Sequence, residues 1–369
     1  MPPTPLFVTR KFPPSVGGMQ TLAAAVWRSL LRTTPYARLV AHGGSNGRVP
    51  LWLPGALVRV VGLFGRRRVS VMLAGDLLMY TLIYPFVRLF RVRSATFVHG
   101  LDITYRNPLY RAVAYRVLRR APRVLANSAA TAEVAKSIGV PPERISVVRL
   151  CVTAPPVAAR DRTAARSELL GRFDLSSDVV LLLTLGRLVP RKGSRWFVES
   201  VLPALPDRVV YLIAGDGPER DRIASAARRA GVSHRVRILG LVDEADRELL
   251  MRGVDIFIQP NVRVRGDMEG FGLVTIETAL RGTPTVASAL EGILDAVVND
   301  VTGVLLPPEA PAEWVARLTT LIESPDDLVA MGTRFQAEVR SRFSEEQMSR
   351  QLEADLGLRP TDPVASRSG

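Results

Sequence analysis

Short apolar runs alternate with longer amphipathic stretches along nearly the whole chain, and this alternation limits the fold more than any other feature of the sequence. The runs of the first half are Leu6–Thr9, Leu39–His42, Val69–Ala74, Ala95–His99, Arg123–Ala126 and Ile145–Val148. Those of the second half are Val179–Leu185, Val209–Ala214, Val236–Leu239, Ile256–Gln259, Thr285–Ala287 and Gly303–Leu306. Continuously apolar strands separated by helices are typical of parallel sheets with helices on both faces. The chain is therefore predicted to be an α/β protein.

The two sets of strands are separated by a segment rich in Pro, Ala and Arg, which runs from Thr153 to Ala165. A chain of 369 residues is expected to hold about two domains. We predict two Rossmann-like domains facing a cleft, with boundaries at residues 1–158 and 159–345. Residues 346–369 are expected to hold a C-terminal helix that packs back toward the N-terminal domain, followed by a disordered tail from Arg359 to Gly369.

The positive charge of the chain lies almost entirely in its first half. Residues 1–150 carry 22 Lys and Arg against four Asp and Glu, whereas the remainder carries 27 against 31. Such an asymmetry suggests that the first half faces an anionic partner. A GC-rich genome is an alternative explanation for the use of arginine, since the chain has only three lysines. It does not explain why acidic residues are missing from one half.

Neither a metal site nor a membrane span is predicted. The histidines His42, His99 and His234 are scattered, and the sequence has no Asp-x-Asp pair that would hold a divalent ion. The single cysteine, Cys151, excludes an intrachain disulfide. The apolar window Val71–Phe90 contains charges and a proline, so it is interpreted as a buried strand followed by a helix. With no signal-peptide pattern at the N-terminus, a cytoplasmic location is expected.

The segment from Glu269 to Glu277 is the strongest candidate for a ligand site. It places two carboxylates around a glycine-rich turn that leads into an amphipathic pattern, so a helix is expected to begin near Phe271 to Leu273. Unpaired amides at a helix start attract anions, and glycines let a ligand approach the backbone. The alternative is an ordinary loop with solvated glutamates. The residues expected to hold a ligand are Glu269, Gly270, Phe271, Gly272, Leu273, Val274 and Glu277.

Loops at the ends of two strands in the second half add further candidates. Arg187 leaves the end of a long apolar strand, and Lys192 follows across a turn. Two such cations can clamp a diphosphate and stabilise the charge that accumulates as it departs. Leu241 and Val242 are expected to pass their backbone near a nucleotide base. The Ala214–Glu219 turn lacks the third glycine of a dinucleotide fingerprint, so no nicotinamide cofactor is indicated.

In the first half, two features stand at the carboxyl ends of strands, where open α/β sheets bind ligands. Gly17 and Gly18 precede an apolar helical run and are positioned to approach a diphosphate. His99 ends another strand; a structural role for this lone histidine is the alternative to a catalytic one.

A basic and apolar surface is also expected in the first half. Six arginines and no acidic residue lie between Arg106 and Arg123, interleaved with Leu109, Val113 and other apolar residues. This mixture suits the surface of an anionic membrane. A nucleic-acid groove and a solvated helix face are the alternatives. The arginines expected at this surface are Arg66, Arg67, Arg68, Arg111, Arg116, Arg119 and Arg120.

Taken together, these segments resemble the retaining glycosyltransferases of family 4, which have the GT-B fold and transfer a sugar from a nucleotide-sugar donor. The resemblance spans nearly the whole chain. Within the family, the chain is similar to mannosyltransferases that act on phosphatidylinositol mannosides. The motifs that carry the resemblance are Gly17-Gly18, His99-Gly100, Gly186-Arg187 with Arg191-Lys192-Gly193, Gly215-Asp-Gly-Pro218, and Glu269 to Glu277 followed by Gly282-Thr-Pro284.

The resemblance implies a role for each motif. Arg187 and Lys192 would bind the donor's diphosphate, with Gly17 or Gly18 closing over it, and Glu277 would accept from the ribose hydroxyls. Glu269 would hold the sugar's hydroxyls together with the amides that follow it. His99 would lie beside the sugar at the reaction centre, which makes His99, Glu269, Arg187 and Lys192 the expected catalytic set. No cofactor and no bound metal are implied.

The chain departs from the family pattern in two places. The usual Gly-Val-Asp between the domains is Cys151-Val152-Thr153, which puts the hinge geometry in doubt, and a usual Gly-Gly is Glu291-Gly292. Our hypothesis is a cytoplasmic hexosyltransferase bound peripherally at the inner membrane face. GDP-mannose is the favoured donor, a UDP-sugar comes next, and the acceptor is a lipid, polyol or glycan. A silent sugar-nucleotide-binding regulator and a basic nucleic-acid-binding protein are the alternatives.

Overall fold

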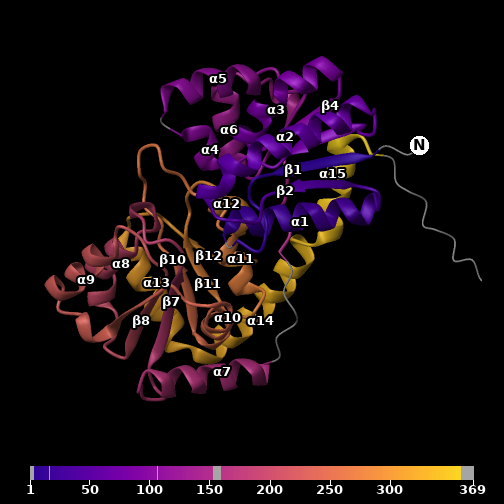
Figure 1. The fold of residues 1–369 in the computed structure, drawn as a ribbon. Helices are drawn as coiled ribbons and strands as arrows, with labels where there is room; N and C mark the ends of the chain where they lie inside the picture. The colour runs from indigo at the N-terminus through magenta and orange to yellow at the C-terminus, as the bar shows by residue number, and fades with distance from the viewer. Residues whose placement is uncertain (1–3, 16, 106, 153–158, 359–369) are drawn as a thin grey trace, which may run out of the picture. The chain divides into compact units, whose positions relative to one another are not determined.

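The computed structural model describes residues 4–15, 17–105, 107–152 and 159–358 (Figure 1). It divides into two compact units, which we describe separately. The first unit comprises residues 1–152 with 343–369, and the second comprises residues 153–342. The expected tail from Arg359 to Gly369, Arg106 of the basic segment and Thr153 of the hinge motif lie outside the described residues.

The first unit is built on a six-stranded parallel sheet with the order β2-β1-β3-β4-β5-β6. Because β1 lies between β2 and β3, the chain changes direction across the sheet at β1 and β3. Their carboxyl ends therefore flank a switch point, which is where α/β sheets bind ligands. The strands are β1 (Pro5–Thr9), β2 (Arg38–Ala41), β3 (Val71–Ala74), β4 (Arg93–Val98), β5 (Arg123–Ala126) and β6 (Ile145–Val147).

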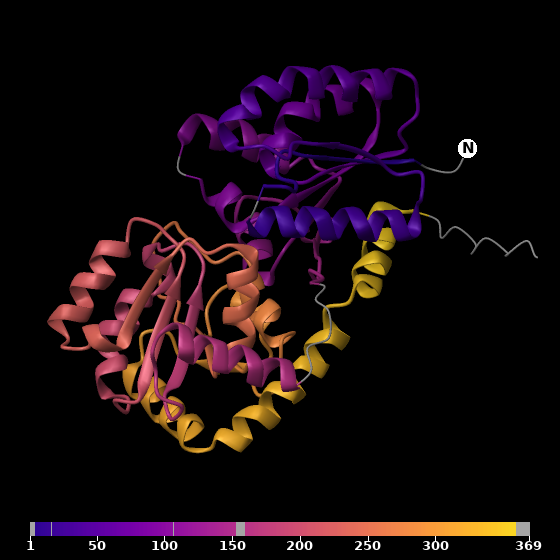
Figure 2. The ribbon, with the colours of Figure 1, turned by 60° about the horizontal axis from the view of Figure 1, so that its bottom comes forward.

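Helices cover both faces of this sheet (Figures 1 and 2). A buried core joins α2, α3 and α5 to the sheet, with Phe64, Tyr80 and Val117 among its residues. On the other face, α1 packs against the C-terminal helix α15. The helices of the unit are α1 (Gly18–Thr33), α2 (Val49–Gly65), α3 (Leu77–Phe90), α4 (Gly100–Thr104), α5 (Pro108–Leu118), α6 (Ala129–Ser137) and α15 (Glu345–Leu356).

The second unit repeats the architecture with the strand order β12-β11-β10-β7-β8-β9, again parallel. Its switch point lies between β7 and β10. The strands are β7 (Val180–Leu185), β8 (Val209–Ala214), β9 (Val236–Gly240), β10 (Ile256–Gln259), β11 (Thr285–Ser288) and β12 (Val304–Leu306). The helices are α7 (Ala159–Arg172), α8 (Ser194–Ser200), α9 (Arg220–Arg229), α10 (Glu244–Gly253), α11 (Leu273–Ala279), α12 (Ile293–Ala296), α13 (Pro311–Glu323) and α14 (Pro325–Arg342).

Two apolar layers form the core of the second unit, one on each face of its sheet. Phe197, Trp314 and Phe335 bring α8, α13 and α14 onto one face. Leu169 and Leu250 bring α7 and α10 onto the other. Burial of the sheet on both faces explains why its strands are apolar without alternation.

The C-terminal helix α15 belongs to the first unit, so the expectation that it packs back onto the N-terminal domain is confirmed. Its buried residues Met348, Leu352 and Leu356 follow the spacing of one helix face. Polar contacts fix its orientation on α1: Glu345 pairs with Arg28 at 2.6 Å, and the Ser349 hydroxyl donates to the Ser29 carbonyl at 3.2 Å. The helix thereby returns the chain from the second unit to the first.

Each of the twelve predicted strands is present within a few residues of its expected bounds, and the prediction of an α/β fold with two Rossmann-like domains is confirmed. The window Val71–Phe90 divides as expected into β3 and α3. Asp76 ends the turn between them, because its Oδ1 accepts from the Met79 amide at 3.0 Å and caps α3. Within the described ranges, no helix is long and apolar enough to cross a bilayer.

Candidate active site

The loops that follow β7, β8 and β10 are pressed against one another at the carboxyl edge of the second sheet. Gly215 approaches Gly186 so closely that a Cβ at Gly215 would lie 1.9 Å from the Gly186 carbonyl oxygen. A Cβ at Gly193 would lie 1.7 Å from the carbonyl oxygen of Pro260. Only glycine fits such contacts. The glycines quoted above as motifs therefore hold this edge together, and they place Lys192 beside the segment that contains Glu269.

Lys192, Arg191 and Glu269 form a buried ionic cluster at this edge. The Lys192 ammonium lies 2.6 Å from Glu269 Oε2, and an Arg191 guanidinium nitrogen lies 2.9 Å from the same oxygen. Arg191 also bonds Asp267 through Nε at 3.0 Å. The sequence analysis predicted Lys192 and Glu269 as site residues, and the structure brings them into direct contact.

Burial and charge act in opposite directions on this cluster. Burial alone would raise the pKa of Glu269, but the charges of Lys192 and Arg191 outweigh it and lower that pKa to about 2. Burial lowers the pKa of Lys192, although Glu269 opposes the shift. With its carboxylate ionised, Glu269 holds two cations just past the carboxyl end of β7, where they are preorganised for an anionic ligand.

Two further contacts fix the position of Glu269. The Asn261 amide donates to Glu269 Oε2 at 3.2 Å. The backbone amide of Glu269 donates to Glu291 Oε2 at 2.6 Å, and burial raises the pKa of Glu291. Glu291 adopts a left-handed conformation with φ of 52°. The residue that departs from the family's usual Gly-Gly therefore supports the backbone of the glutamate expected to hold the sugar.

Arg187 differs from Lys192 in its surroundings. It lies just past β7 and its side chain is exposed. Among the residues that the structure describes, no hydrogen bond or ion pair holds its guanidinium. Arg187 is thus free to reach an anion, whereas Lys192 already has a counterion.

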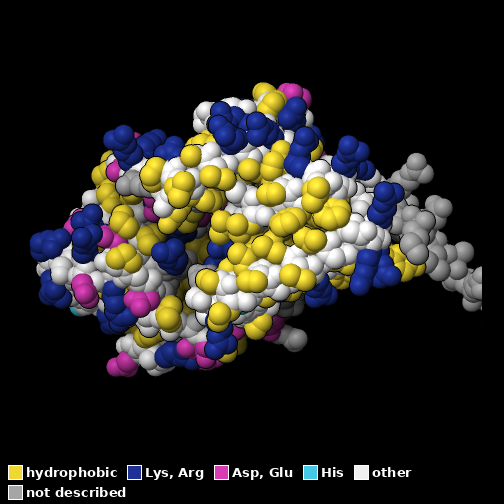
Figure 3. Space-filling view, turned by 45° about the horizontal axis from the view of Figure 1, so that its top comes forward, with side chains coloured by type: hydrophobic (Ala, Val, Ile, Leu, Met, Phe, Trp, Pro, Cys, Tyr) yellow, Lys and Arg dark blue, Asp and Glu magenta, His cyan; other side chains and the backbone are white. Residues whose placement is uncertain are grey.

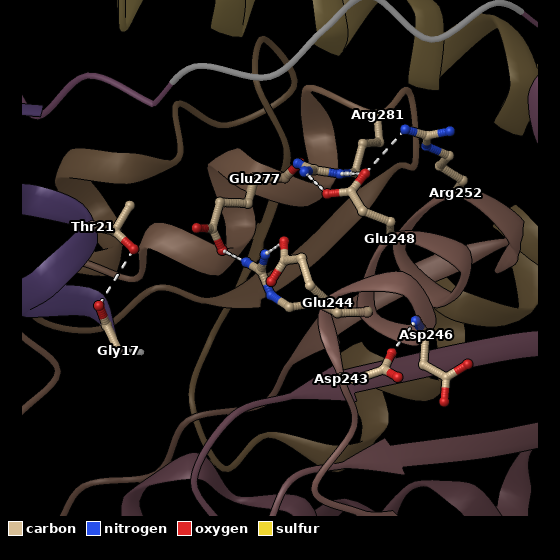
Figure 4. A network of polar contacts seen from close by, with 10 residues as sticks. Gly17, Thr21, Asp243, Glu244, Asp246, Glu248, Arg252, Glu277 and Arg281 are labelled. Atoms are coloured by element: carbon tan, nitrogen blue, oxygen red, sulfur yellow. Dashed lines mark hydrogen bonds and ion pairs between the residues drawn. The ribbon is translucent and has the colours of Figure 1, made fainter. Parts of the chain in front are cut away.

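Glu277 lies in α11, which begins at Leu273 after Gly272 takes a left-handed φ of 84°. The helix start therefore falls where the sequence placed it. Glu277 is buried, and its Oε2 lies 2.5 Å from the Arg247 guanidinium, which also contacts Glu244 at 2.9 Å (Figure 4). Within this turn Phe271 is buried, while Val274 packs against the core of one face of the sheet. Glu277 is thus oriented by a cation from α10.

The residues expected near a nucleotide base lie just beyond β9. Leu241 is 82% exposed, and Val242 is half-buried against the core. The carbonyl oxygen of the preceding Gly240 accepts a hydrogen bond from the Gly215 amide at 2.7 Å. This contact ties the loop with Leu241 to the same carboxyl edge as Arg187 and Lys192.

In the first unit, Gly17 and Gly18 stand at the start of α1, after the loop that leaves β1. The Gly17 carbonyl accepts from the Gln20 amide and from the Thr21 amide, each at 3.0 Å, and from the Thr21 hydroxyl (Figure 4). The two glycines are therefore part of the first turn of the helix.

His99 lies at the carboxyl end of β4 and begins α4. Its Nε2 lies 2.9 Å from the Gly75 carbonyl, to which it donates, and its ring stacks on Phe97. The His99 amide donates to Asp102 at 2.7 Å, and burial raises the pKa of Asp102 to about 6. Through this contact, His99 Nε2 links the carboxyl end of β4 to the residue that follows β3.

Beside His99, the switch point of the first sheet carries a second ion pair. Asp76, with no exposed surface, lies 3.1 Å from Arg10 Nε. Burial, followed by the charge of Arg10, lowers the pKa of the neighbouring Lys11. These polar residues line the carboxyl edge at β1 and β3.

Sequence reasoning did not single out Arg191, Asn261 or Glu291 as site residues, nor Arg247 or Asp76. Arg191, Asn261 and Glu291 contact Glu269, and Arg247 contacts Glu277. Asp76 pairs with Arg10, which sequence reasoning did not single out either. Arg191 directly precedes Lys192, so the basic pair was a signal that could have been used. The pairing of Arg247 with Glu277, 30 residues apart, has no local signal.

Comparisons with known proteins agree with this architecture. A family model described as "Glycosyltransferase Family 4" matches residues 20–153, and one described as "Glycosyl transferases group 1" matches residues 180–324. The chain is similar to D-inositol 3-phosphate glycosyltransferase of Segniliparus rotundus, with 31% identity over 265 residues, which is 70% of this chain and 56% of that protein. It is also similar to the putative colanic acid biosynthesis glycosyltransferase WcaL of Salmonella typhimurium, with 26% identity over 71% of this chain and 63% of that one.

Solved structures match over nearly the full length. Anabaena Alr3699/HepE in complex with UDP superposes with a TM-score of 0.74 at 20% identity, covering 96% of this chain and 99% of that one. Sucrose-phosphate synthase from Thermosynechococcus elongatus gives 0.73 at 19% identity, covering 95% and 98%. These likenesses and the two parallel sheets define a protein of the GT-B fold.

More narrowly, the chain belongs to glycosyltransferase family 4, because the two family models match one unit each and together span most of its length. The chain spans about half the length of the curated relatives that it matches.

Proposed function

We propose that this protein is a retaining, metal-independent glycosyltransferase that moves a hexose from a nucleotide sugar to an acceptor at a membrane surface. The observation that carries the proposal is the buried cluster of Lys192, Arg191 and Glu269 at the switch point of the second sheet. A carboxylate suits sugar hydroxyls, and paired cations suit a diphosphate. Family membership supports the same reading.

In the proposed reaction, the bond between the anomeric carbon and the diphosphate oxygen breaks while a bond to the acceptor oxygen forms on the same face. The diphosphate leaves with the bonding electron pair and takes the acceptor's proton. Lys192 and Arg187 neutralise the charge that accumulates on it, which is the role expected of preorganised cations. Glu269 accepts from the sugar's hydroxyls, and Glu277, oriented by Arg247, accepts from the ribose.

The donor proposed from the sequence is GDP-mannose, with a UDP-sugar as the second choice. Two findings on similar proteins support the UDP-sugar: Anabaena HepE was solved with UDP and with UDP-glucose. The base is expected to meet the backbone around Leu241 and Val242, where side chains specify little. The choice between the two donors therefore rests on a binding measurement.

Calorimetric titration of the protein with GDP, UDP and ADP, without added metal and in the presence of a chelator, tests the donor site. We expect one nucleotide to bind with micromolar affinity. Glu277→Ala is expected to weaken that binding by about tenfold or more, because a hydrogen bond to a charged, buried group is worth about 1.5–3 kcal/mol.

Glu244→Ala is the matched control for this measurement. Glu244 contacts the same Arg247 guanidinium from the exposed side, and its loss leaves the pair of Arg247 with Glu277 in place. We expect the nucleotide affinity of this variant to stay within about twofold of wild type, because an exposed ion pair contributes little free energy. Failure of all three nucleotides to bind would remove the proposal, and equal weakening in both variants would remove Glu277 from it.

The proposed membrane face lies on helices α2, α3 and α5 of the first unit. Figure 3 shows a face where apolar side chains gather beside arginines. Leu51 and Val58 of α2 are 84% and 74% exposed, and Leu109 of α5 is 75% exposed. Apolar residues open to solvent beside cations suit the headgroup region of an anionic bilayer. The exposed arginines of these helices and their ends include Arg59, Arg66, Arg67, Arg68, Arg88, Arg111, Arg116, Arg119 and Arg120.

The structure divides the apolar residues of this segment into two groups. Leu109 and Val113 are exposed, whereas Ala114, Val117 and Leu118 belong to the core. The interleaving of arginine with apolar residues in α5 therefore reflects, in part, an ordinary amphipathic helix. Arg111 stacks over the ring of Tyr115, its centroid 5.1 Å away. The exposed apolar residues, rather than the arginines alone, carry the membrane proposal.

Sedimentation with vesicles tests it. We expect binding to anionic vesicles, little binding to neutral ones, and loss of binding at high salt. Leu51→Ser with Val58→Ser is expected to weaken the binding about thirtyfold, because each exposed apolar side chain contributes about 1 kcal/mol when it is partly buried in lipid. Val329→Ser, at an exposed position on α14 of the second unit, is the control. Equal binding to neutral and anionic vesicles would contradict the proposal.

A further inference from the structure

A basic hollow lies in the first unit at the end of the sheet opposite His99. It has a volume of about 400 Å³ and forms where α3 ends, β4 begins and the connection from α5 enters β5. His99 follows the last residue of β4, and a six-residue strand is about 20 Å long, so the hollow is remote from the carboxyl edge. The residues that line it are Tyr84, Val87, Arg88, Arg91, Val92, Arg93, Ser94, Arg120 and Pro122.

Four of the lining residues are arginines, and none is acidic. Arg93 donates to the Leu356 carbonyl at 2.9 Å, and no carboxylate within the described part of the chain pairs with it. For Arg88, Arg91 and Arg120, no side-chain hydrogen bond or ion pair joins them to any residue that the structure describes. The nearby Asp355 already pairs with Arg123, so it does not neutralise the hollow.

Compensation of helix dipoles does not account for so much charge. Both α3 and α5 end here, and each helix end carries about half a negative charge. The two ends together supply about one negative charge against four guanidinium groups. The excess of about three positive charges in a concave site, without acidic partners, is the property of an anion-binding site.

We propose that this hollow binds a phosphate ester, separately from the nucleotide sugar and whether or not glycosyl transfer is the protein's activity. Guanidinium groups bind phosphate oxygens through paired N–H donors, and several arginines that converge on one hollow favour a dianionic group. The Ser94 hydroxyl, shared with Tyr80 at 3.0 Å, adds a polar group to the wall. The chemical class of the ligand is therefore a phosphate monoester or diphosphate.

Such a phosphate can come from a lipid headgroup or from a soluble molecule, and the rim of the hollow is relevant to the choice. Leu89 and Phe90 on the last turn of α3 are exposed, and Phe90 contacts Phe64 of α2 with ring centroids 6.1 Å apart. Apolar residues at the rim of a phosphate site match a lipid, whose chains lie beside its headgroup.

Titration with inorganic phosphate and with pyrophosphate, followed by calorimetry at low salt, tests the site. Arg88→Ala with Arg91→Ala is compared with Arg334→Ala with Arg340→Ala, which removes the same charge from exposed positions on α14, outside the hollow and outside the proposed membrane face. We expect the first variant to lose at least tenfold in affinity and the second to stay within twofold. A parallel arm measures sedimentation with vesicles that contain phosphatidic acid or only phosphatidylcholine.

The arms distinguish the two sources of phosphate. Saturable binding of the soluble ions that depends on Arg88 and Arg91 indicates a soluble ligand, and dependence seen only with phosphatidic acid indicates a lipid headgroup. Equal losses in the two variants, or no dependence on the hollow in either arm, would overturn the proposal. Nucleotide binding is measured on the same samples, and we expect it to be unchanged in both variants. If no nucleotide binds to wild type, the proposed function fails, and the phosphate measurement is still decided by its own comparison. Arg120→Glu provides a second variant at an exposed position of the hollow.

Discussion

Replacing Lys192 with methionine is expected to lower the rate of nucleotide release from the bound donor sugar by about a hundred- to a thousandfold. The reason is electrostatic, because Lys192 is a buried cation held 2.6 Å from Glu269 at the place proposed for the departing diphosphate. Methionine fills a similar volume without the charge. The measurement is donor turnover by the variant against wild type, with nucleotide binding followed by calorimetry.

The fold is expected to survive this change. After loss of Lys192, Glu269 keeps Arg191 at 2.9 Å and Asn261 at 3.2 Å, so no buried charge is left without a partner. We expect the free energy of unfolding to change by no more than about 1–2 kcal/mol. Turnover that stays within about threefold of wild type would contradict the assigned role of Lys192.

Glu269→Gln is the informative contrast to Lys192→Met. It leaves Lys192 and Arg191 facing each other without their shared carboxylate, and removal of one partner of a buried pair costs about 3–5 kcal/mol. Asp267 still holds Arg191, so we expect the loss at the lower end of that range. A large stability loss for Glu269→Gln with a small one for Lys192→Met would show that the cluster requires its anion for folding. Together with the expected loss of turnover in Lys192→Met, it would show that the lysine serves the chemistry.

The fold could be predicted from the sequence because its signals are local and repeated. Each buried strand is a short apolar run, and each is separated from the next by an amphipathic pattern long enough for a helix. Even the window Val71–Phe90 was divisible, since Asp76 is a good helix cap and a poor residue for a bilayer. The amphipathic pattern of Glu345–Leu356 predicted the helix α15, and its packing on the first unit was expected from the resemblance to GT-B proteins.

Much less of the candidate site could be predicted, because its contacts join residues that are distant in sequence. Glu269 and Lys192 were identified by their motifs, but the contact between them crosses 77 positions and comes from the neighbouring strands β7 and β10. Glu291 was visible only as a departure from a family pattern, although its carboxylate holds the Glu269 amide. Likewise, the contact of His99 Nε2 with the Gly75 carbonyl joins residues 24 positions apart and has no local signal.

The basic half shows a related limit of sequence reasoning. The charge asymmetry was plain from counting, but counting does not tell which arginines converge. Arg88, Arg91, Arg93 and Arg120 meet in one hollow because α3, β4 and the end of α5 share one end of the sheet. Only the arrangement of these elements separates a concave phosphate site from a flat basic face.

Gly193→Ala is expected to cost more than about 3 kcal/mol of unfolding free energy, whereas Gly231→Ala costs about 1 kcal/mol. The two glycines form a matched pair, with φ of 68° and 71°. A Cβ at Gly231 meets nothing within 4 Å, so only the left-handed backbone opposes it. At Gly193 the same backbone term applies, and the Cβ would in addition lie 1.7 Å from the Pro260 carbonyl oxygen.

The difference between the two variants therefore measures the close approach of the β7 and β10 loops, with the backbone term removed. Chemical denaturation of both variants and of wild type supplies it, provided that unfolding of the second unit is followed. Because Gly193 directly follows Lys192 and ends its 3-10 turn, displacement of Pro260 also moves the lysine relative to Glu269. Turnover is thus expected to fall in Gly193→Ala and to remain within about twofold of wild type in Gly231→Ala, which lies in a turn after α9. Equal stability losses in the two variants would mean that the loops can separate at little cost, and the edge that holds the ionic cluster would not be as rigid as the proposed chemistry requires.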